Sequence, residues 1–195
     1  DAERNLLYIP VSSPSPNFFG GNRLKPIPLG TSVTALDIAT GKVVWSRQLV
    51  HHDLWDYDTN SAPTLIDITR DGKTIPALVQ TSKQGFLYVL DRTNGEPIYP
   101  IEERPVPQST VPGERSSTTQ PFVALPRATV DPEWPGIFKL ADIVSFGYCS
   151  RKLKELVYQG RFTPPSLQGS LTYPATIGGV EWGGGAVDPD KQIFV

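Results

Sequence analysis

The 195-residue sequence contains no methionine, a single cysteine and only two histidines. The lone Cys149 excludes an intrachain disulfide and any metal site built from several cysteines. No apolar run approaches the ~20 residues of a membrane-spanning helix. An excess of one charge is also missing: 18 Lys and Arg against 20 Asp and Glu exclude the basic stripe of a nucleic-acid-binding protein. Since residue 1 is Asp and no Met occurs, we expect a segment of a longer polypeptide.

Turn-forming residues are abundant, with 20 Pro and 17 Gly. Because 38% of the residues are hydrophobic, the chain can still bury a core, and the composition predicts short elements separated by many turns. Residues 32–37 alternate polar and apolar side chains, as a half-buried strand does. Residues 5–10 and 43–46 also have β character, so the first 50 residues are typical of strands joined by turns.

A strand–turn–strand unit repeats along the chain. ALDIATGKVVW (35–45) and VLDRTNGEPIY (89–99) align without a gap, which pairs Asp37 with Asp91, Gly41 with Gly95 and Trp45 with Tyr99. In such a unit the Asp bonds turn N–H groups, the Gly supplies a positive φ, and the aromatic packs between neighbouring sheets. A partial echo follows at 186–195. The alternative is a pair of unrelated hairpins, but the matches at three fixed offsets favour the blades of a β-propeller.

We therefore predict an all-β fold, a partial β-propeller with a Pro-rich and helical insertion. Blade-like repeats are expected at about 5–50, 77–100 and 171–195, and the insertion at about 101–165. The Pro-rich first half of the insertion predicts an extended loop. Its second half predicts one amphipathic helix near 141–158 with a solvated basic face, because apolar residues recur there at helical spacing: Phe146, Cys149, Leu153, Leu156 and Val157.

The densest polar cluster is HHDLWDYD, residues 51–58, which holds both histidines and three carboxylates. On a strand, alternation would place His52, Leu54, Asp56 and Asp58 on one face. The cluster fits neither a zinc site, since no Cys or third His is available, nor the loop of an EF-hand, since the Gly and the ligand spacing are missing. Two interpretations stay open from the residues alone: a loop whose side chains cap backbone groups, and an active-site loop.

Further motifs favour the active-site interpretation of residues 51–58. The stretch 77–109 contains an SKQG turn whose Lys83 follows Asp56 by 27 residues, and GRFTPPSLQGSLTYP (160–174) and EWGGGAVDP (181–189) come later. Together with HHDLWDYD these motifs resemble the membrane-bound quinoprotein dehydrogenases of the glucose/quinate/shikimate type. That family uses pyrroloquinoline quinone (PQQ) and has an eight-bladed propeller. The resemblance covers essentially all of the chain and includes the insertion before FTPPS.

The resemblance implies roles for three residues. Asp56 matches the general base that takes the substrate hydroxyl proton while hydride moves to the quinone. Lys83 matches the lysine that hydrogen-bonds the reactive quinone oxygens. Trp182 lies in a stretch similar to a cofactor-lining segment, although a core aromatic fits that position equally well. We expect His51, His52 and Asp53 to support the loop.

One departure concerns the metal that the resemblance also implies, a calcium ion beside PQQ. Many relatives read Gly-Asn where this chain has Ser12-Ser13, and the Asn supplies an amide oxygen to the calcium. A hydroxyl is a poorer calcium ligand than an amide carbonyl. We therefore assign no metal ligand in this sequence.

The function that the resemblance implies is oxidation of a sugar or polyol-type alcohol such as glucose, quinate or shikimate. Electrons would pass to ubiquinone at the periplasmic face of the bacterial inner membrane, with membrane anchoring by segments outside this chain and no nucleic-acid partner. We expect the isolated segment to be inactive and to self-associate through blade surfaces that lack their neighbours. The alternative is a non-catalytic propeller module for protein binding, with a decayed cofactor site; the presence of both Asp56 and Lys83 speaks against it.

Overall fold

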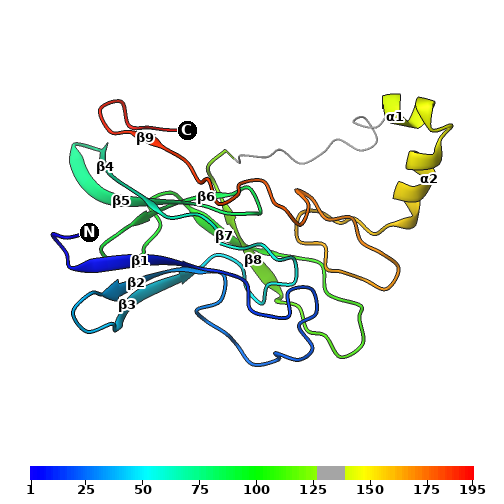
Figure 1. Ribbon diagram of the computed structural model, residues 1–195, viewed down its shortest axis with the longest axis horizontal. Helices are drawn as coiled ribbons and strands as arrows, with labels where there is room; N and C mark the ends of the chain where they lie inside the picture. Colours follow the sequence, from blue (N-terminus) through cyan, green and yellow to red (C-terminus); the bar gives the residue numbers. More distant parts are fainter. Residues whose placement is uncertain (127–138) are drawn as a thin grey trace.

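The computed structural model describes residues 1–126 and 139–195, and within them all paired strands named here are antiparallel. Two three-stranded sheets come first, in the orders β1-β2-β3 and β4-β5-β6, followed by two two-stranded ones (Figure 1). The strands are β1 Leu6–Val11, β2 Ser32–Asp37, β3 Val43–Gln48, β4 Thr64–Arg70, β5 Lys73–Thr81, β6 Leu87–Asp91, β7 Ile101–Pro105, β8 Thr119–Val123, β9 Val187–Asp188 and β10 Ile193–Phe194. The all-β prediction is confirmed.

Similar hydrogen bonds close the repeated turns in both copies, although the threonine lies three residues after Asp37 and two residues after Asp91. Asp37 Oδ1 accepts from the backbone N and Oγ1 of Thr40, at 2.7 Å each, and Asp91 Oδ1 accepts from the N and Oγ1 of Thr93, at 2.8 and 2.6 Å. The glycine N–H of each turn donates to the carbonyl of its Asp at 2.8 Å. Both glycines have a left-handed φ, +68° at Gly41 and +76° at Gly95, which explains the glycine in each copy.

The aromatic of the first repeat packs between the two large sheets. Trp45, on β3, is buried, and its Nε1 donates to the carbonyl of Arg92, in the turn of the second sheet, at 3.2 Å. The Tyr8 hydroxyl donates to the same carbonyl at 2.9 Å. One cluster of buried residues extends across both sheets, from Val33 and Ala35 to Leu78 and Leu90. The turn of one sheet is therefore the docking surface for the preceding sheet.

We expect Gly95→Ala to destabilise the protein more than Gly41→Ala does. A Cβ at Gly95 would lie 2.6 Å from Trp45 Cε3, whereas a Cβ at Gly41 would meet nothing within 4 Å. The strain of a left-handed L-residue, about 1–2 kcal/mol, is common to both variants. Overpacking against Trp45 adds about 1–3 kcal/mol at Gly95 only. Urea unfolding of both variants checks this; equal losses would mean that Trp45 moves aside freely.

The predicted insertion differs from expectation in its first half. Residues 101–105 and 119–123 form a β-hairpin in place of the expected extended loop. Proline is tolerated there because Pro105 and Pro121 lie in a two-stranded sheet, where a missing N–H costs few ladder bonds. Residues 127–138 of the insertion lie outside the described residues.

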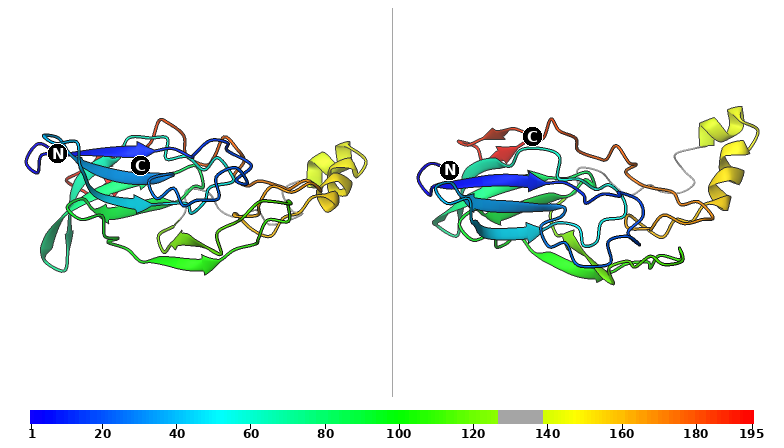
Figure 2. Two further views of the ribbon diagram at one scale, coloured as in Figure 1. Left: turned by 90° about the horizontal axis from the view of Figure 1, so that it is seen from below. Right: turned by 60° about the horizontal axis from the view of Figure 1, so that its bottom comes forward.

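The single helix predicted near 141–158 is wrong. Two short helices, α1 Lys139–Val144 and α2 Tyr148–Glu155, project away from the sheets (Figures 1 and 2). The chain breaks between them because Phe146 and Gly147 adopt left-handed φ values of 51° and 76°. Asp142 stabilises the break by accepting hydrogen bonds from the backbone N and the hydroxyl of Ser150. Phe146, expected on the apolar face of the helix, is 90% exposed.

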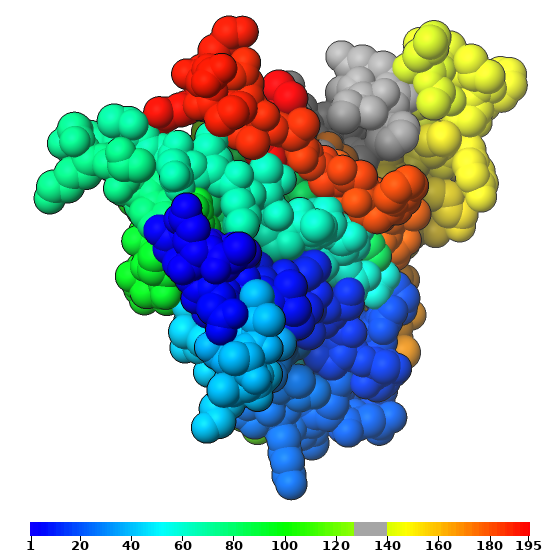
Figure 3. Space-filling view, turned by 60° about the vertical axis from the view of Figure 1, so that its left-hand side comes forward, coloured from blue at the N-terminus to red at the C-terminus, as the bar shows by residue number. Residues whose placement is uncertain are grey.

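The C-terminal echo also forms a hairpin, β9–β10, whose Asp188 Oδ1 accepts from the backbone N of Asp190 and Lys191 at 3.1 Å. This hairpin lies on the second sheet: Val187 and Phe194 pack against the Ile66 and Val79 cluster, and the backbone N of Thr69 donates to Gln192 Oε1. Figure 3 shows the C-terminal segment, in red, lying along the β4 region.

The turns and the long loops lie at opposite ends of the strands. Asp37 and Asp91 end β2 and β6 at one end, whereas residues 12–31, 49–63 and 82–86 connect strand ends at the other. Both the HHDLWDYD segment (51–58) and the SKQG turn (82–85) therefore lie at the end of the strands where the long loops are.

Candidate functional site

Lys83 lies between two carboxylates of the HHDLWDYD segment. Its Nζ is 3.0 Å from Asp56 Oδ2 and 2.7 Å from Asp58 Oδ2. The three side chains are mostly buried, 10% exposed for Lys83 and 18% and 17% for the two carboxylates. The structure thus joins Asp56 and Lys83, which are 27 residues apart in sequence, in one cluster.

The side chains of residues 55–58 point alternately into the core and towards Lys83, although the segment is irregular and contains no strand. Trp55 and Tyr57 are buried, and their rings pack against Phe162 of the FTPP motif. Trp55 Nε1 donates to the Thr163 carbonyl at 2.7 Å, and the Tyr57 hydroxyl donates to the Arg161 carbonyl at 2.9 Å. With the aromatics turned into the core, the intervening carboxylates are directed to Lys83.

The buried carboxylate of Asp53 organises the same loop. Oδ1 accepts from the backbone N of Trp55 at 2.9 Å, and Oδ2 accepts from the backbone N of Tyr57 at 3.0 Å and from Thr31 Oγ1 at 3.0 Å. Burial raises the pKa of Asp53 to about 6, against the opposing effect of these hydrogen bonds. The Asp53 carboxylate therefore fixes the backbone on both sides of Asp56.

Asp53→Asn is expected to remove a pH dependence of stability. The folded protein retains the Asp53 proton up to about pH 6, whereas an unfolded Asp loses it near a pKa of about 3.9. The stabilisation is fully present below about pH 4 and is lost as the pH rises through about 6, by on the order of 3 kcal/mol. Urea unfolding from pH 4 to 7 measures the difference between wild type and variant, with the exposed Asp71→Asn as the control. Parallel curves for wild type and Asp53→Asn would contradict it.

The two carboxylates affect the protonation of Lys83. Burial alone would lower the pKa of Lys83, but hydrogen bonds and charge from Asp58 and Asp56 outweigh it and raise the pKa above its usual value. The ammonium group is therefore charged at neutral pH. The backbone around it is fixed as well, because Lys83 N donates to the Asp58 carbonyl at 3.2 Å and Gly179 N donates to the Lys83 carbonyl at 2.7 Å.

Two further residues contribute to the cluster, both on the 12–31 loop, and neither contact was predicted from the sequence. Asn17 Nδ2 donates to Asp56 Oδ1 at 2.6 Å, and the backbone N of Ser13 donates to Asp58 Oδ1 at 2.8 Å. Asp58 itself was placed with Asp56 on one face but was given no role. No local pattern reveals Asn17, because the contact spans 39 residues between two irregular segments.

Trp182 lies on the C-terminal segment that passes Lys83. Gly178, four residues earlier, packs on the Lys83 side chain so closely that a Cβ there would lie 2.6 Å from Lys83 Cγ. Glu181 accepts a hydrogen bond from Asn60 at 2.7 Å. The Trp182 side chain itself is 82% exposed. Its role in lining a cofactor stays a prediction.

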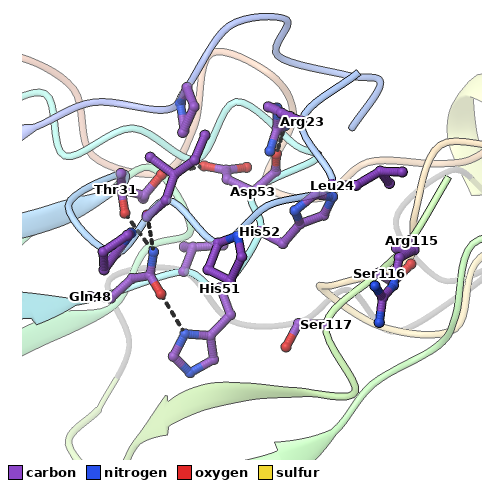
Figure 4. A pocket seen from close by; sticks show the side chains of 16 residues that line it. Arg23, Leu24, Thr31, Gln48, His51, His52, Asp53, Arg115, Ser116 and Ser117 are labelled. Carbon is purple, nitrogen blue, oxygen red and sulfur yellow. Dashed lines mark hydrogen bonds between the residues drawn. The ribbon is translucent and has the colours of Figure 1, made fainter. Parts of the chain in front are cut away.

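A cavity of about 350 Å³ lies beside the HHDLWDYD loop, between residues 14–31, 48–53 and 115–117 (Figure 4). Asp53 lines it, whereas Asp56 and Lys83 do not. His51 is held there by Gln48 and Glu103, both at 2.9 Å. Burial and the charge of Arg23 lower the pKa of His52, so the ring is neutral at pH 7. These contacts hold the loop in place.

Comparison with known proteins identifies the family. The model for the β-propeller domain of glucose, ethanol and alcohol dehydrogenases that use PQQ matches residues 1–195. The chain belongs to this PQQ β-propeller family. The prediction of a partial quinoprotein propeller is thereby confirmed.

Curated relatives share this similarity along the whole chain. The sequence is 43% identical to the quinoprotein glucose dehydrogenase of Gluconobacter oxydans over 195 residues, which is 99% of this chain and 24% of that protein. Identity is 41% with the quinoprotein glucose dehydrogenase of Escherichia coli and 37% with the quinate/shikimate dehydrogenase (quinone) of Acinetobacter baylyi. Both of these matches cover 100% of this chain and 25% of the relative. The chain thus spans about a quarter of the relatives' length.

Solved structures agree on the fold. A quinohemoprotein alcohol dehydrogenase from Pseudomonas putida matches 97% of this chain and 23% of its own, at 27% identity and a TM-score of 0.57. A europium-containing methanol dehydrogenase matches 100% of this chain and 27% of its own with a TM-score of 0.60, and at 21% identity this likeness concerns the fold alone.

The donors described above can bind a quinone cofactor, but by themselves they do not complete the ligand shell of a calcium ion. The Lys83 ammonium, at the loop end and 10% exposed, can donate to carbonyl oxygens beside the Asp56 carboxylate. A calcium ion needs six to eight oxygen ligands. Here Lys83 already pairs with one oxygen of each carboxylate, and Ser13 presents its N–H to Asp58. Among the residues described, no group of three or more His, Cys, Asp or Glu could hold a metal ion.

Proposed function

We propose that this chain forms part of the active site of a PQQ-dependent dehydrogenase that oxidises a sugar or polyol-type alcohol. Glucose, quinate and shikimate are the substrate types that the names of its relatives indicate. The proposal further includes ubiquinone as the electron acceptor and a position at the periplasmic face of the bacterial inner membrane. In the described part of the chain no helix is long and apolar enough to cross a membrane.

The observation that carries this proposal is the contact of Lys83 with both Asp56 and Asp58. Asp56 acts as the general base: its carboxylate takes the proton of the substrate hydroxyl. PQQ, when bound, supplies the quinone that accepts hydride. Lys83 donates hydrogen bonds towards the quinone oxygens and so stabilises the negative charge that develops there. Asp58 keeps the ammonium in place during proton transfer.

The chain contributes three blade-like repeats with an insertion to such a propeller, and by itself it is inactive in this proposal. Exposed apolar side chains remain on the first sheet, with Leu7, Val43 and Val44 each about half exposed. Such side chains favour self-association of the isolated chain.

A propeller module without catalytic activity is the alternative function. The feature that favours it is Ser13, which stands where many relatives read Asn and whose buried hydroxyl has no hydrogen-bond partner among the described residues. Against this alternative, burying a lysine together with two carboxylates costs desolvation free energy, and a loop with only a structural role does not need such a cluster.

A PQQ titration of the full-length parent protein, followed by dye reduction across a panel of polyols, tests the proposal. Turnover that depends on PQQ and on one class of alcohol is the expected result. If PQQ does not bind and no alcohol reduces the dye, the enzymatic function is wrong and the scaffold interpretation replaces it.

A further inference from the structure

We infer that Asn17 is a positioning residue that holds one oxygen of the Asp56 carboxylate and leaves the other to take the substrate proton. The inference rests on the proposed function. It concerns a residue that was given no role from the sequence.

The two oxygens of Asp56 have different donors. Asn17 Nδ2 donates to Oδ1 at 2.6 Å, and Lys83 Nζ donates to Oδ2 at 3.0 Å. A carboxylate that is bonded at both oxygens cannot turn about its terminal bond without breaking one of these contacts. Lys83 is closer to Asp58, at 2.7 Å, so the ammonium stays anchored when Oδ2 of Asp56 accepts a proton. Oδ2 is therefore the reactive oxygen and Oδ1 the fixed one.

The loop around Asn17 is built to present this side chain inward. Asn17 is half-buried, whereas its neighbours Pro16 and Phe18 are exposed. The loop is tied down on both sides of it: the Ser13 backbone N donates to Asp58, and the buried Arg23 donates from Nε to the Pro16 carbonyl at 3.2 Å. Arg23 also donates to the Asp53 carbonyl. The amide of Asn17 is thus placed by the same segment that carries Asp56.

An amide suits this position because it is a neutral donor. A second cation at Oδ1 would stabilise the carboxylate so strongly that it would be a poor proton acceptor. A carboxylate at position 17 would repel Asp56 and favour its protonated form. The neutral donor orients the base without either effect, and Asn17→Asp therefore tests more than the loss of a contact.

The experiment compares Asn17→Ala, Asn17→Asp and Asn22→Ala in the PQQ-loaded full-length protein. Asn22 is an exposed asparagine on the same loop and serves as the matched control. We expect Asn17→Ala to lower kcat about ten-fold with KM and the Kd for PQQ unchanged within about two-fold. Asn17→Asp moves the acid limb of the pH–rate profile to higher pH. Asn22→Ala behaves as wild type.

A readout independent of turnover is the side-chain amide resonance of Asn17 in the NMR spectrum of the full-length protein. Its downfield shift disappears in Asp56→Ala if the hydrogen bond exists. If Asp56→Asn abolishes turnover while Asn17→Ala keeps the wild-type kcat and pH profile, the inference about Asn17 is wrong and the proposed function stands. If Asp56→Asn has no effect either, the proposed function fails, and with it the role of Asn17.

Discussion

Asp56→Asn lowers kcat of the PQQ-loaded full-length protein by about 10²–10⁴-fold, the usual contribution of a general base. The amide side chain can keep a contact with Lys83 through its oxygen, but it cannot accept the substrate proton. The backbone should tolerate the change, because Asp56 has a left-handed φ of 59° and Asn adopts this conformation as readily as Asp does. Steady-state kinetics at saturating substrate and PQQ measures the effect.

Asp71→Asn is the matched control for this variant. Asp71 also has a left-handed φ, of 51°, and its side chain is 92% exposed in the turn between β4 and β5. It should leave kcat and the unfolding midpoint at their wild-type values. A kcat for Asp56→Asn within a few-fold of wild type, with PQQ bound, would show that another group takes the proton.

Lys83→Met has the second large effect, a fall in kcat of about 10²–10³-fold, which is the typical loss when one donor to a developing negative charge is removed. Methionine has a similar length and no charge. The variant also leaves Asp56 and Asp58 facing each other without their shared cation, so we expect weaker PQQ binding and a lower unfolding midpoint. Kinetics at saturating PQQ, a PQQ titration and thermal unfolding separate the three effects.

Lys42→Met provides the comparison, because Lys42 is an exposed lysine in the turn after β2. It changes neither turnover nor PQQ affinity. Should Lys83→Met keep wild-type turnover at saturating PQQ, Lys83 would have only the structural task of separating the two carboxylates.

Local features of the fold were predictable from the sequence. The turns at 37–41 and 91–95 are closed by residues within five positions of each other, so Asp, Thr and Gly in the right order are sufficient to specify them. Pairing of Asp56 with Lys83 was predictable only through the family resemblance, since no periodicity links a loop after β3 to a turn after β5.

Features that depend on contacts between distant segments were not predictable. The hydrogen bond of Asn17 to Asp56 joins two irregular loops, and neither loop has a pattern that fixes its path. The break between α1 and α2 was missed for a different reason: helical spacing of apolar side chains says nothing about the left-handed backbone of Phe146, which the capping by Asp142 makes favourable.

The distance between the Trp45 contact and the Lys83 cluster has a consequence for how such proteins diverge. Trp45 docks on the turn at one end of the strands, and that contact uses Arg92 and Gly95. Asp56 and Lys83 lie in loops at the opposite end of the same strands. Loops such as 12–31 can therefore be lengthened, shortened or exchanged without disturbing the Trp45 contact that packs one blade against the next. One scaffold can acquire new substrate preferences in this way while its assembly stays the same.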